Sequence, residues 1–179
     1  MSDFTVRVLT DDDWELYRTF RLASLAESPD AFAASHDEEQ EFGEDVWRER
    51  MLRATRLLAE AEGKAVGVAS VRRLDDDGGE DHELAEFFGM WVDPDRRGQG
   101  IGVKLMRAAV GIARSMGSDE LVYWVSTDNG PGVAFASSYG FRTTDARRPM
   151  KDAQDDEDEM LMVLPLADSP NPSSADLDD

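Results

Sequence analysis

Residues 92–102 read VDPDRRGQGIG, and this stretch decides how the rest of the chain is interpreted. Glycines stand at positions 98, 100 and 102, after an apolar run and before a long helical pattern. Because glycine costs backbone entropy, the cluster indicates a backbone that bends sharply or lies close to a ligand. A strand, a glycine loop and a helix start together form an anion site, since the free N–H groups of the first turn and the helix dipole both favour negative charge.

The segments around this loop predict an α/β protein with a mixed sheet. Expected strands are 4–9, a hairpin within 56–74 with Gly63 and Lys64 at its turn, 82–92, 120–126, a strand beginning near 140–144, and 159–166. Expected helices cover 12–28, 43–54, 101–116 and 133–139. Residues 1–166 are therefore expected to form one domain. Residues 167–179, ADSPNPSSADLDD, are expected to be a disordered acidic tail because of their composition.

Composition narrows the class of protein further. The formal net charge is −20, the opposite of the basic footprint of a nucleic-acid binder, so no nucleic-acid partner is expected. The chain has no cysteine and only two histidines, which excludes disulfides and thiolate metal sites, and no metal is expected. No apolar run approaches the roughly 18 residues of a membrane span, and the N-terminus lacks a signal-peptide core. We expect a soluble cytoplasmic protein without a membrane partner.

The spacing of the glycines excludes two common nucleotide loops. A dinucleotide-binding loop needs two residues between its second and third glycines, whereas one residue separates Gly100 from Gly102. A Walker A loop needs Gly-Lys followed by Ser or Thr, which is absent. The anion is therefore not expected to belong to a nucleotide bound by either of these motifs.

The pattern Arg97-x-x-Gly100-x-Gly102, preceded by WVDP, resembles the pyrophosphate loop of the GCN5-related N-acetyltransferases, the GNAT family, which bind acetyl-CoA. Upstream, AEFFGMWV (85–92) is similar to the fourth strand of that family. Downstream, STDNGPGVAFASSYGF (126–141) is similar to its N…A…Y…GF segment. The resemblance spans roughly residues 4–166. It implies a single domain with a mixed, mostly antiparallel central sheet flanked by helices.

The resemblance also implies an activity and its cosubstrate. It implies an N-acetyltransferase that moves an acetyl group from acetyl-CoA to a primary amine by direct attack in a ternary complex. The absence of cysteine agrees with a route that has no cysteine-bound covalent intermediate. The acceptor is an amine-bearing small molecule or a peptide or protein amine. A non-catalytic CoA-binding module and an acyltransferase for a longer acyl chain remain alternatives, and a homodimer remains open.

The residues that would bind acetyl-CoA follow from the same resemblance. The backbone of the loop would hold the pyrophosphate, with charge added by Arg96, Arg97 and Lys104. The main chain of the preceding strand would bond to the pantetheine. Asn129 matches an asparagine that contacts CoA in the family, although it is equally a turn former in DNG. The expected cofactor-binding residues are Met90, Trp91, Val92, Arg97, Gly98, Gln99, Gly100, Ile101, Gly102, Val103 and Asn129.

Glu86 is the expected catalytic residue. It lies in LAEFFGM, a carboxylate among apolar neighbours, and such surroundings make a carboxylate a stronger base. Its position matches the glutamate that some GNAT enzymes use as general base, often through a water molecule. Its alternative role is an edge residue that faces solvent or pairs with an arginine. His82 and Glu83, at the start of the same expected strand, are the weaker candidates.

The acceptor pocket is expected over residues 26–40, with residues 144–158 nearby, as the resemblance implies. The acidic segment HDEEQE (36–41) is interpreted as a solvated face or as a site for the ammonium group of the acceptor.

The usual general acid of the family is missing from the expected position. Many GNAT enzymes have a tyrosine seven residues after the asparagine and four before the Gly-Phe pair. Counting from Asn129 and from Gly140 gives Ala136 both times. Tyr139 is expected to pack in the core. A thiol with a pKa of about 8.5 can leave as a thiolate without a dedicated acid. We therefore expect either that no side chain is an indispensable general acid or that a water molecule fills the gap beside Ala136.

Overall fold

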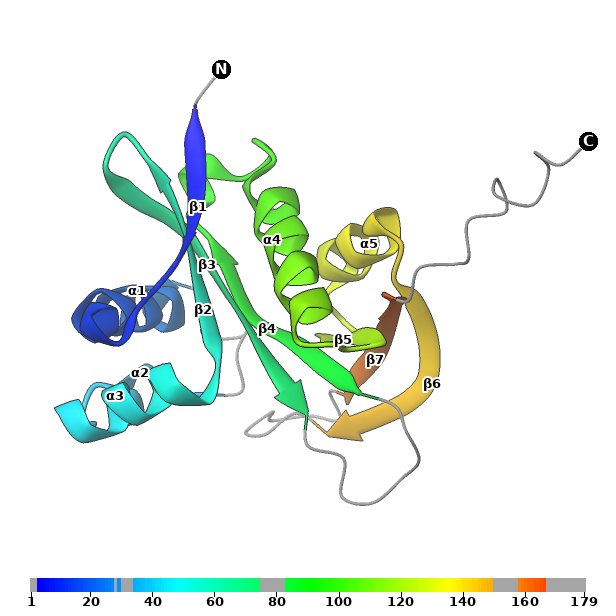
Figure 1. Cartoon of the computed structure of the whole chain (residues 1–179), viewed down its shortest axis with the longest axis horizontal. Helices are drawn as coiled ribbons and strands as arrows, with labels where there is room; N and C mark the ends of the chain where they lie inside the picture. The colour runs from blue at the N-terminus through cyan, green and yellow to red at the C-terminus, as the bar shows by residue number, and fades with distance from the viewer. Residues whose placement is uncertain (1–2, 28, 30–33, 75–82, 150–157, 167–179) are drawn as a thin grey trace, which may run out of the picture.

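The computed structural model describes residues 3–27, 29, 34–74, 83–149 and 158–166. Its centre is a mixed seven-stranded sheet with the strand order β1-β2-β3-β4-β5-β7-β6 (Figure 1). Every neighbouring pair is antiparallel except β4 and β5, which run parallel. The expected mixed, mostly antiparallel sheet is therefore confirmed. The strands are β1 (Phe4–Val8), β2 (Thr55–Ala61), β3 (Lys64–Leu74), β4 (Leu84–Val92), β5 (Glu120–Ser126), β6 (Arg142–Pro149) and β7 (Asp158–Pro165).

The helices lie on both sides of this sheet. They are α1 (Trp14–Glu27), α2 (His36–Glu39), α3 (Glu44–Arg53), α4 (Ile101–Ser115) and α5 (Gly130–Tyr139). Figure 1 shows α1, α2 and α3 grouped together beside the β1–β3 half of the sheet, apart from α4 and α5. A short 3₁₀ turn, Pro94–Arg96, connects β4 to the glycine loop. This arrangement leaves the end of β4 between two groups of helices.

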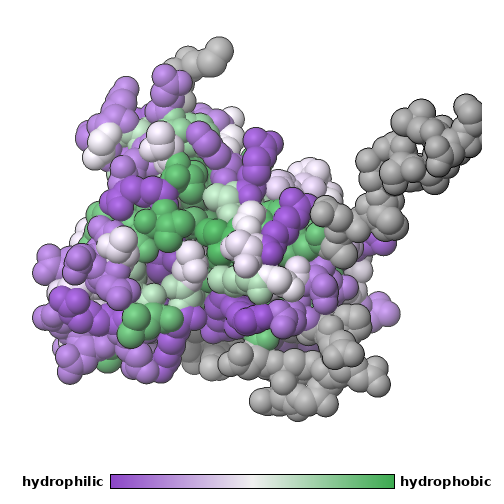
Figure 2. All heavy atoms as spheres, in the orientation of Figure 1, coloured by the Kyte–Doolittle hydropathy of each residue, from purple (hydrophilic) through white to green (hydrophobic). Residues whose placement is uncertain are grey.

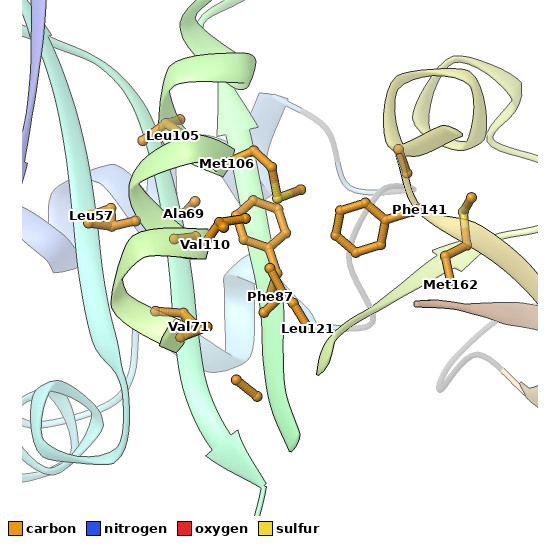
Figure 3. Close-up of a cluster of buried hydrophobic side chains, with 14 of the residues drawn as sticks. Leu57, Ala69, Val71, Phe87, Leu105, Met106, Val110, Leu121, Phe141 and Met162 are labelled. Carbon is orange, nitrogen blue, oxygen red and sulfur yellow. The ribbon is translucent and has the colours of Figure 1, made fainter. Parts of the chain in front are cut away.

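The larger core lies between α4 and the sheet. Leu105, Met106 and Ala109 of α4 are fully buried, as is Phe87 of β4. In Figure 3, Met106 and Val110 point toward Phe87, and the helix lies along the strands of Leu57, Ala69 and Val71. The apolar residues of α4 recur at helical spacing and so form one face that packs on the sheet. This packing fixes the first turn of α4 relative to β4.

The second core lies on the opposite face, under α1 and α3. Trp47 of α3 is completely buried there, and its ring packs edge-on against Tyr17 of α1 with ring centroids 6.0 Å apart. Leu58 and Val68 supply the floor from β2 and β3. Side chains in a strand alternate between faces, so this set and the α4 core share the same strands.

Strands β4 and β5 separate halfway along their length. Their pairing runs from Leu84 with Glu120 to Phe87 with Tyr123, and then stops, although both strands continue. In addition, β4 is bulged: Val68 pairs with Trp91 but Ser70 pairs with Phe88, so one residue of β3 opposes two residues of β4. The bulge includes Gly89, whose φ is +63°. The separation opens the sheet at its centre.

The hairpin turn differs by one residue from the sequence expectation. The turn is formed by Glu62 and Gly63, with φ values of 53° and 74°, while Lys64 already belongs to β3. Two consecutive residues with positive φ make the tight hairpin turn that matches strand twist. A glutamate at the first position hid this from the sequence, because asparagine, aspartate or glycine is usual there.

Candidate active site at the opening of the sheet

A pocket of about 670 Å³ occupies the opening between β4 and β5 and reaches the first turn of α4. Its volume lies in the range of about 300–1,000 Å³ that is usual for ligand sites. Three parts of the chain form its wall: the end of β4, the glycine loop with the start of α4, and the start of α5. The lining residues are Met90, Trp91, Val92, Arg96, Arg97, Gly98, Gly100, Ile101, Gly102, Val103, Tyr123, Asn129, Pro131, Gly132 and Phe135.

The glycine loop has the backbone conformation that an anion cradle needs. Gly98 and Gly100 have φ values of 79° and 87°, and Gly100 caps the N-terminus of α4. An L-residue adopts this left-handed conformation only at a cost, which explains why glycine occupies both positions. The space where a Cβ of either residue would lie is open. The unbonded N–H groups of the first turn of α4 therefore border an accessible pocket.

The main chain of β4 presents alternate residues to the opening. Asp93 donates its N–H to the Val66 carbonyl of β3, and Trp91 is in register with Val68. Because main-chain groups alternate along a strand, the Met90 carbonyl and the Val92 N–H are directed away from β3, to the side that β5 has left. Of the three residues expected to bond to the pantetheine, these two have the required direction, whereas Trp91 belongs to the ladder with β3.

The end of α1 is tied to the same loop. Glu27 Oε2 accepts a hydrogen bond from Trp91 Nε1 at 2.8 Å and from the guanidinium of Arg97 at 3.3 Å. Arg97 Nε also donates to the carbonyl of Val92 at 3.0 Å. Arg97 therefore holds the loop against β4 and α1, and about half of its side chain remains exposed to solvent.

Lys104 does not take the position expected from the sequence. Its ammonium group donates to the Phe4 carbonyl at 2.7 Å and lies 4.8 Å from the centre of the Phe4 ring. It therefore fastens α4 to β1, and it is absent from the pocket wall. Arg96 does line the pocket. The sequence could not separate these cations, because both lie within a few residues of the glycines.

Asn129 has two roles in the structure. Its side chain caps α5 by accepting a hydrogen bond from the Gly132 N–H at 3.0 Å, and it also lines the pocket. A Cβ at position 132 would lie 2.5 Å from Asn129 Nδ2, so only glycine allows this close cap. The interpretation of DNG as a turn former is therefore confirmed, and the contact of Asn129 with CoA stays a prediction.

Glu86 is buried but it is not surrounded by apolar groups alone. Its side chain is on the α1–α3 side of β4, and only 4% of the residue is exposed. Arg72, directly opposite on β3, donates to Glu86 Oε2 from Nε at 2.8 Å and from Nη2 at 2.6 Å. The alternative role from the sequence, a pair with an arginine, is therefore present. Oε1 makes no hydrogen bond to the residues that the structure describes.

The weaker candidates and the acidic segment are placed elsewhere. Glu83 pairs with Arg73 at an exposed position, and His82 lies outside the described residues. In the acidic segment, Glu39 is only 3% exposed and forms ion pairs with Arg21 and Arg50, both at 3.0 Å. Asp37, Glu38 and Glu41 are exposed, as a solvated face requires. Glu39 departs from both interpretations, because it is buried and occupied by arginines. Parts of the expected acceptor region, residues 28, 30–33 and 150–157, also lie outside the described residues.

Two tyrosines differ in their relation to the pocket. Tyr123 lines it at the point where β4 and β5 separate, and its ring packs edge-on against Phe87 at 5.1 Å. Burial, with the negative charge of Glu159, raises the pKa of Tyr123 to about 12. Tyr139 instead packs against the core beside Phe141, as expected. Ala136 is fully buried, so this position packs in the core.

Comparison with known proteins decides the family. The acetyltransferase (GNAT) family matches residues 13–141, which covers most of the chain. The chain belongs to the GNAT family. The matched region includes β4, the glycine loop, α4 and α5, and therefore every element that forms the pocket.

Relatives of this GNAT chain carry acetyltransferase names. It is 33% identical over 85 residues to an uncharacterized N-acetyltransferase of Methanocaldococcus jannaschii, covering 48% of this chain and 38% of that protein. It is 36% identical over 90 residues to the mycothiol acetyltransferase of Clavibacter sepedonicus, covering 50% and 27%. The chain therefore covers well under two thirds of the length of either relative.

A solved structure supports the fold over almost the whole length. A Salmonella typhimurium protein, named as an acetyltransferase and solved with its cofactor acetyl-CoA, superposes with a TM-score of 0.71 at 22% identity. The superposition covers 94% of this GNAT chain and 97% of that protein. The fold is thus shared across the sheet and the helices on both sides.

The residues of this GNAT chain fit acetyl-CoA, judged on its own pocket. The glycine loop offers N–H groups and open space for a pyrophosphate, and β4 is no longer paired with β5 where it borders the pocket. In the described ranges no group of three His, Cys, Asp or Glu side chains is placed to hold a metal ion. The same ranges include no helix long and apolar enough to cross a bilayer.

Sequence reasoning missed two features of this GNAT chain. Tyr123, Pro131 and Phe135 line the pocket but lie outside the glycine motif, and the polar end of Tyr123 within an apolar strand was the available signal. A second pocket, on the α1–α3 side, is lined by arginines from α1, α3, β2 and β3. No local pattern indicates it, because its members are scattered between residues 21 and 72.

Proposed function

We propose that the chain is an N-acetyltransferase that moves an acetyl group from acetyl-CoA to a primary amine by direct attack. The observation that carries this proposal is the separation of β4 from β5 beyond Phe87 and Tyr123, with a pocket that extends from there to the first turn of α4. A gap in the sheet next to an anion cradle suits a long ligand with a phosphate end and a reactive end. Bound acetyl-CoA supplies a thioester there.

The glycine loop holds the pyrophosphate in this proposal. The N–H groups from Arg97 to Val103 supply hydrogen bonds, and Arg96 adds positive charge from the pocket wall. The Met90 carbonyl and the Val92 N–H offer hydrogen bonds along the opening, as an edge strand does to an added strand, while the Val92 carbonyl is bonded to Arg97. Asn129 contributes from the capped start of α5.

Glu86 acts as the general base in this proposal. In the transfer, a bond forms between the amine nitrogen and the carbonyl carbon, the carbon–sulfur bond breaks with its electron pair going to sulfur, and one proton leaves the nitrogen. Arg72 occupies Oε2, so Oε1 is the atom left to receive that proton, through a bridging water molecule. The ion pair also fixes the side-chain direction.

Two donors assist the transfer. The main chain near Met90 lies in the β4 bulge, where one residue of β3 cannot pair with two residues of β4. The N–H groups of this bulge can donate hydrogen bonds to the thioester carbonyl oxygen, which gains negative charge during the transfer. Tyr123 remains protonated at neutral pH, and its hydroxyl makes no hydrogen bond within the described part of the chain, so it can donate to the departing sulfur.

The direct test follows thiol release. Protein, acetyl-CoA and a panel of primary amines are mixed, free thiol is measured, and products are identified by mass. Amine-dependent thiol release with an acetylated product is the expected result. Binding of CoA without release for any amine favours a non-catalytic module instead. The same assay with longer acyl-CoA thioesters tests the acyl chain.

A further inference from the structure

A second pocket, of about 220 Å³, lies against the same bulge of β4 on the α1–α3 side of the sheet. Phe88 and Gly89 form its border with β4, next to Met90, which lines the larger pocket. Its volume is below the range of about 300–1,000 Å³ for drug-sized ligands, which suits a small molecule. The pocket is lined by Tyr17, Arg21, Glu39, Arg50, Arg53, Ala54, Arg56, Arg72, Phe88 and Gly89.

The charge of this pocket is opposite to that of the chain. Five of its ten lining residues are arginines and one is a glutamate, although the whole chain has a formal charge of −20. Glu39 and Glu86 neutralise some of these arginines through the ion pairs described above, and Glu49 pairs with Arg53 at the rim. A cationic cavity in a strongly acidic protein attracts anions locally while the rest of the surface repels them.

Arg56 is the member of this group without a carboxylate partner in the described part of the chain. It is 6% exposed, and its Nη atoms donate to neutral oxygens, to Ser70 Oγ at 2.7 Å and to the Arg50 carbonyl at 2.9 Å. Its Nε is buried and has no hydrogen-bond partner among these residues. Tyr17 and Phe88 pack on the guanidinium faces, at 4.6 and 5.3 Å from the ring centres.

Such an arginine is costly to bury. Burial lowers the pKa of Arg56, and the positive charges of neighbouring arginines act in the same direction. A buried charge is normally paired, because an unpaired one retains its full desolvation cost. An anion entering the pocket would supply the missing charge. Because both Nη atoms are bonded to neutral oxygens, Nε is the donor left for a carboxylate oxygen.

We infer that this pocket binds the carboxylate of the acceptor, so that the acceptor is a small molecule with both a primary amine and a carboxylate, such as an α-amino acid. The inference rests on the proposed acetyl transfer for the role of the amine. The arginines hold the acid end, and Gly89 marks the side at which the amine meets the opening of the sheet. In this inference the arginines bind an anionic group of the acceptor. The acidic segment 36–41 is then not the site that binds the acceptor.

The first experiment compares α-amino acids with their α-amino amides, which differ only in the carboxylate. We expect kcat/KM to be about 10- to 100-fold higher for the acid, the size of one or two charge-assisted hydrogen bonds. In Arg56→Gln the preference should fall to a few-fold, with acetyl-CoA affinity unchanged. Arg48→Gln, an exposed arginine of α3 paired with Glu44, is the matched control and should retain the full preference.

Arg53→Gln is a second variant that tests the same pocket if Arg56→Gln does not fold. Arg53 lines the pocket but its side chain is 67% exposed, so its substitution does not threaten the core. It should reduce the preference for the acid by a smaller factor than Arg56→Gln. Equal use of acids and amides by the parent protein overturns the inference, as does an unchanged preference in a folded Arg56→Gln.

A binding measurement separates this inference from the proposed function. N-acetyl amino acids and their amides are titrated by calorimetry into the protein saturated with CoA. If the parent protein binds the acid and Arg56→Gln does not, the inferred anion site is supported. If no amine is turned over in the same proteins, only the proposed acetyl transfer is contradicted. Turnover of amines with no preference for a carboxylate supports the proposed acetyl transfer and contradicts the inferred carboxylate site.

Discussion

Arg72 and Glu86 face each other across β3 and β4, and both hydrogen bonds from the guanidinium reach the same oxygen, Oε2, at 2.8 and 2.6 Å. The pair leaves the second carboxylate oxygen of a buried residue without a protein partner in the described ranges. A purely structural ion pair gains most from a two-oxygen fork. The one-oxygen arrangement is compatible with a carboxylate that also receives a proton.

Glu86→Gln should lower kcat by about 10²- to 10⁴-fold, because it removes the proposed proton acceptor. The affinity for CoA should stay within about twofold, since Glu86 is absent from the wall of the larger pocket. Steady-state kinetics and calorimetry measure the two quantities separately.

Glu83→Gln is the matched control for Glu86→Gln. Glu83 lies three residues earlier and pairs with Arg73 at an exposed position, so the same chemical change there should leave kcat intact. A folded Glu86→Gln variant whose pH–rate profile equals that of the parent would remove Glu86 from the mechanism.

The loop Arg97–Val103 gives a second prediction. Gly100→Asp places a negative charge at the N-terminus of α4, on a residue with a φ of 87°. We expect the CoA dissociation constant to rise at least about tenfold, which corresponds to about 1.4 kcal/mol, because the new carboxylate opposes the phosphates. The left-handed conformation should also cost about 1–2 kcal/mol of stability.

Gly111→Ala serves as the control for the loop variant. Gly111 lies inside α4, and a Cβ there would have open space around it. Alanine in a helix interior is favoured over glycine by about 0.5–1 kcal/mol, so this variant should melt at a slightly higher temperature and bind CoA normally. Unchanged CoA affinity in a folded Gly100→Asp would contradict the pyrophosphate assignment.

The sequence predicted the fold because its strongest signals are local. Strand 120–126 and the start of the helix at residue 101 coincide with β5 and α4, since apolar periodicity and a glycine cap mark them directly. The site was predictable where it is built from consecutive residues, as in the glycine loop. Figure 2 shows polar and charged side chains over most of one face, with apolar residues toward its middle.

The features that the sequence did not predict are contacts across the sheet. Lys104 reaches Phe4, which is a hundred positions away. A pair between Glu86 and an arginine was among the expectations, but only strand register identifies Arg72 as that arginine. Single-sequence patterns carry no information on register between distant strands. The same reason hid the arginine pocket, whose arginines come from four elements. The expected tail, residues 167–179, lies outside the described residues and remains a prediction.

Tyr123 gives a prediction for alkaline pH. Its pKa is raised to about 12 in the folded protein, from about 10 in an unfolded chain. The unfolded state therefore loses its proton first, and the stability that this tyrosine contributes is complete below pH 10 and lost as the pH rises toward 12. The loss amounts to about 2–3 kcal/mol at most.

Tyr123→Phe should remove that component of the pH dependence. Urea unfolding of the parent and of Tyr123→Phe at pH 9.5, 10.5 and 11.5 measures it, and the difference between the two proteins should change steadily with pH. Tyr139→Phe, which removes a tyrosine hydroxyl beside Phe141 instead, is the control and should follow the parent. Parallel curves for the parent and Tyr123→Phe would show that Tyr123 ionises normally.

The two tyrosines also separate the proposals for the departing sulfur. Tyr123 lines the pocket where β4 and β5 part, whereas Tyr139 packs beside Phe141 with ring centroids 6.4 Å apart. Tyr123→Phe should reduce kcat by about tenfold, the size of one hydrogen bond to a charged group, with little change in CoA affinity. The loss should shrink with a thioester whose thiol is more acidic, because a better leaving group needs less stabilisation. Tyr139→Phe should keep most of the activity. A hundredfold drop in kcat for Tyr139→Phe, with stability and CoA affinity intact, would mean that Tyr139 of α5 acts as the general acid. The count that places the acid at the buried Ala136 would then be wrong.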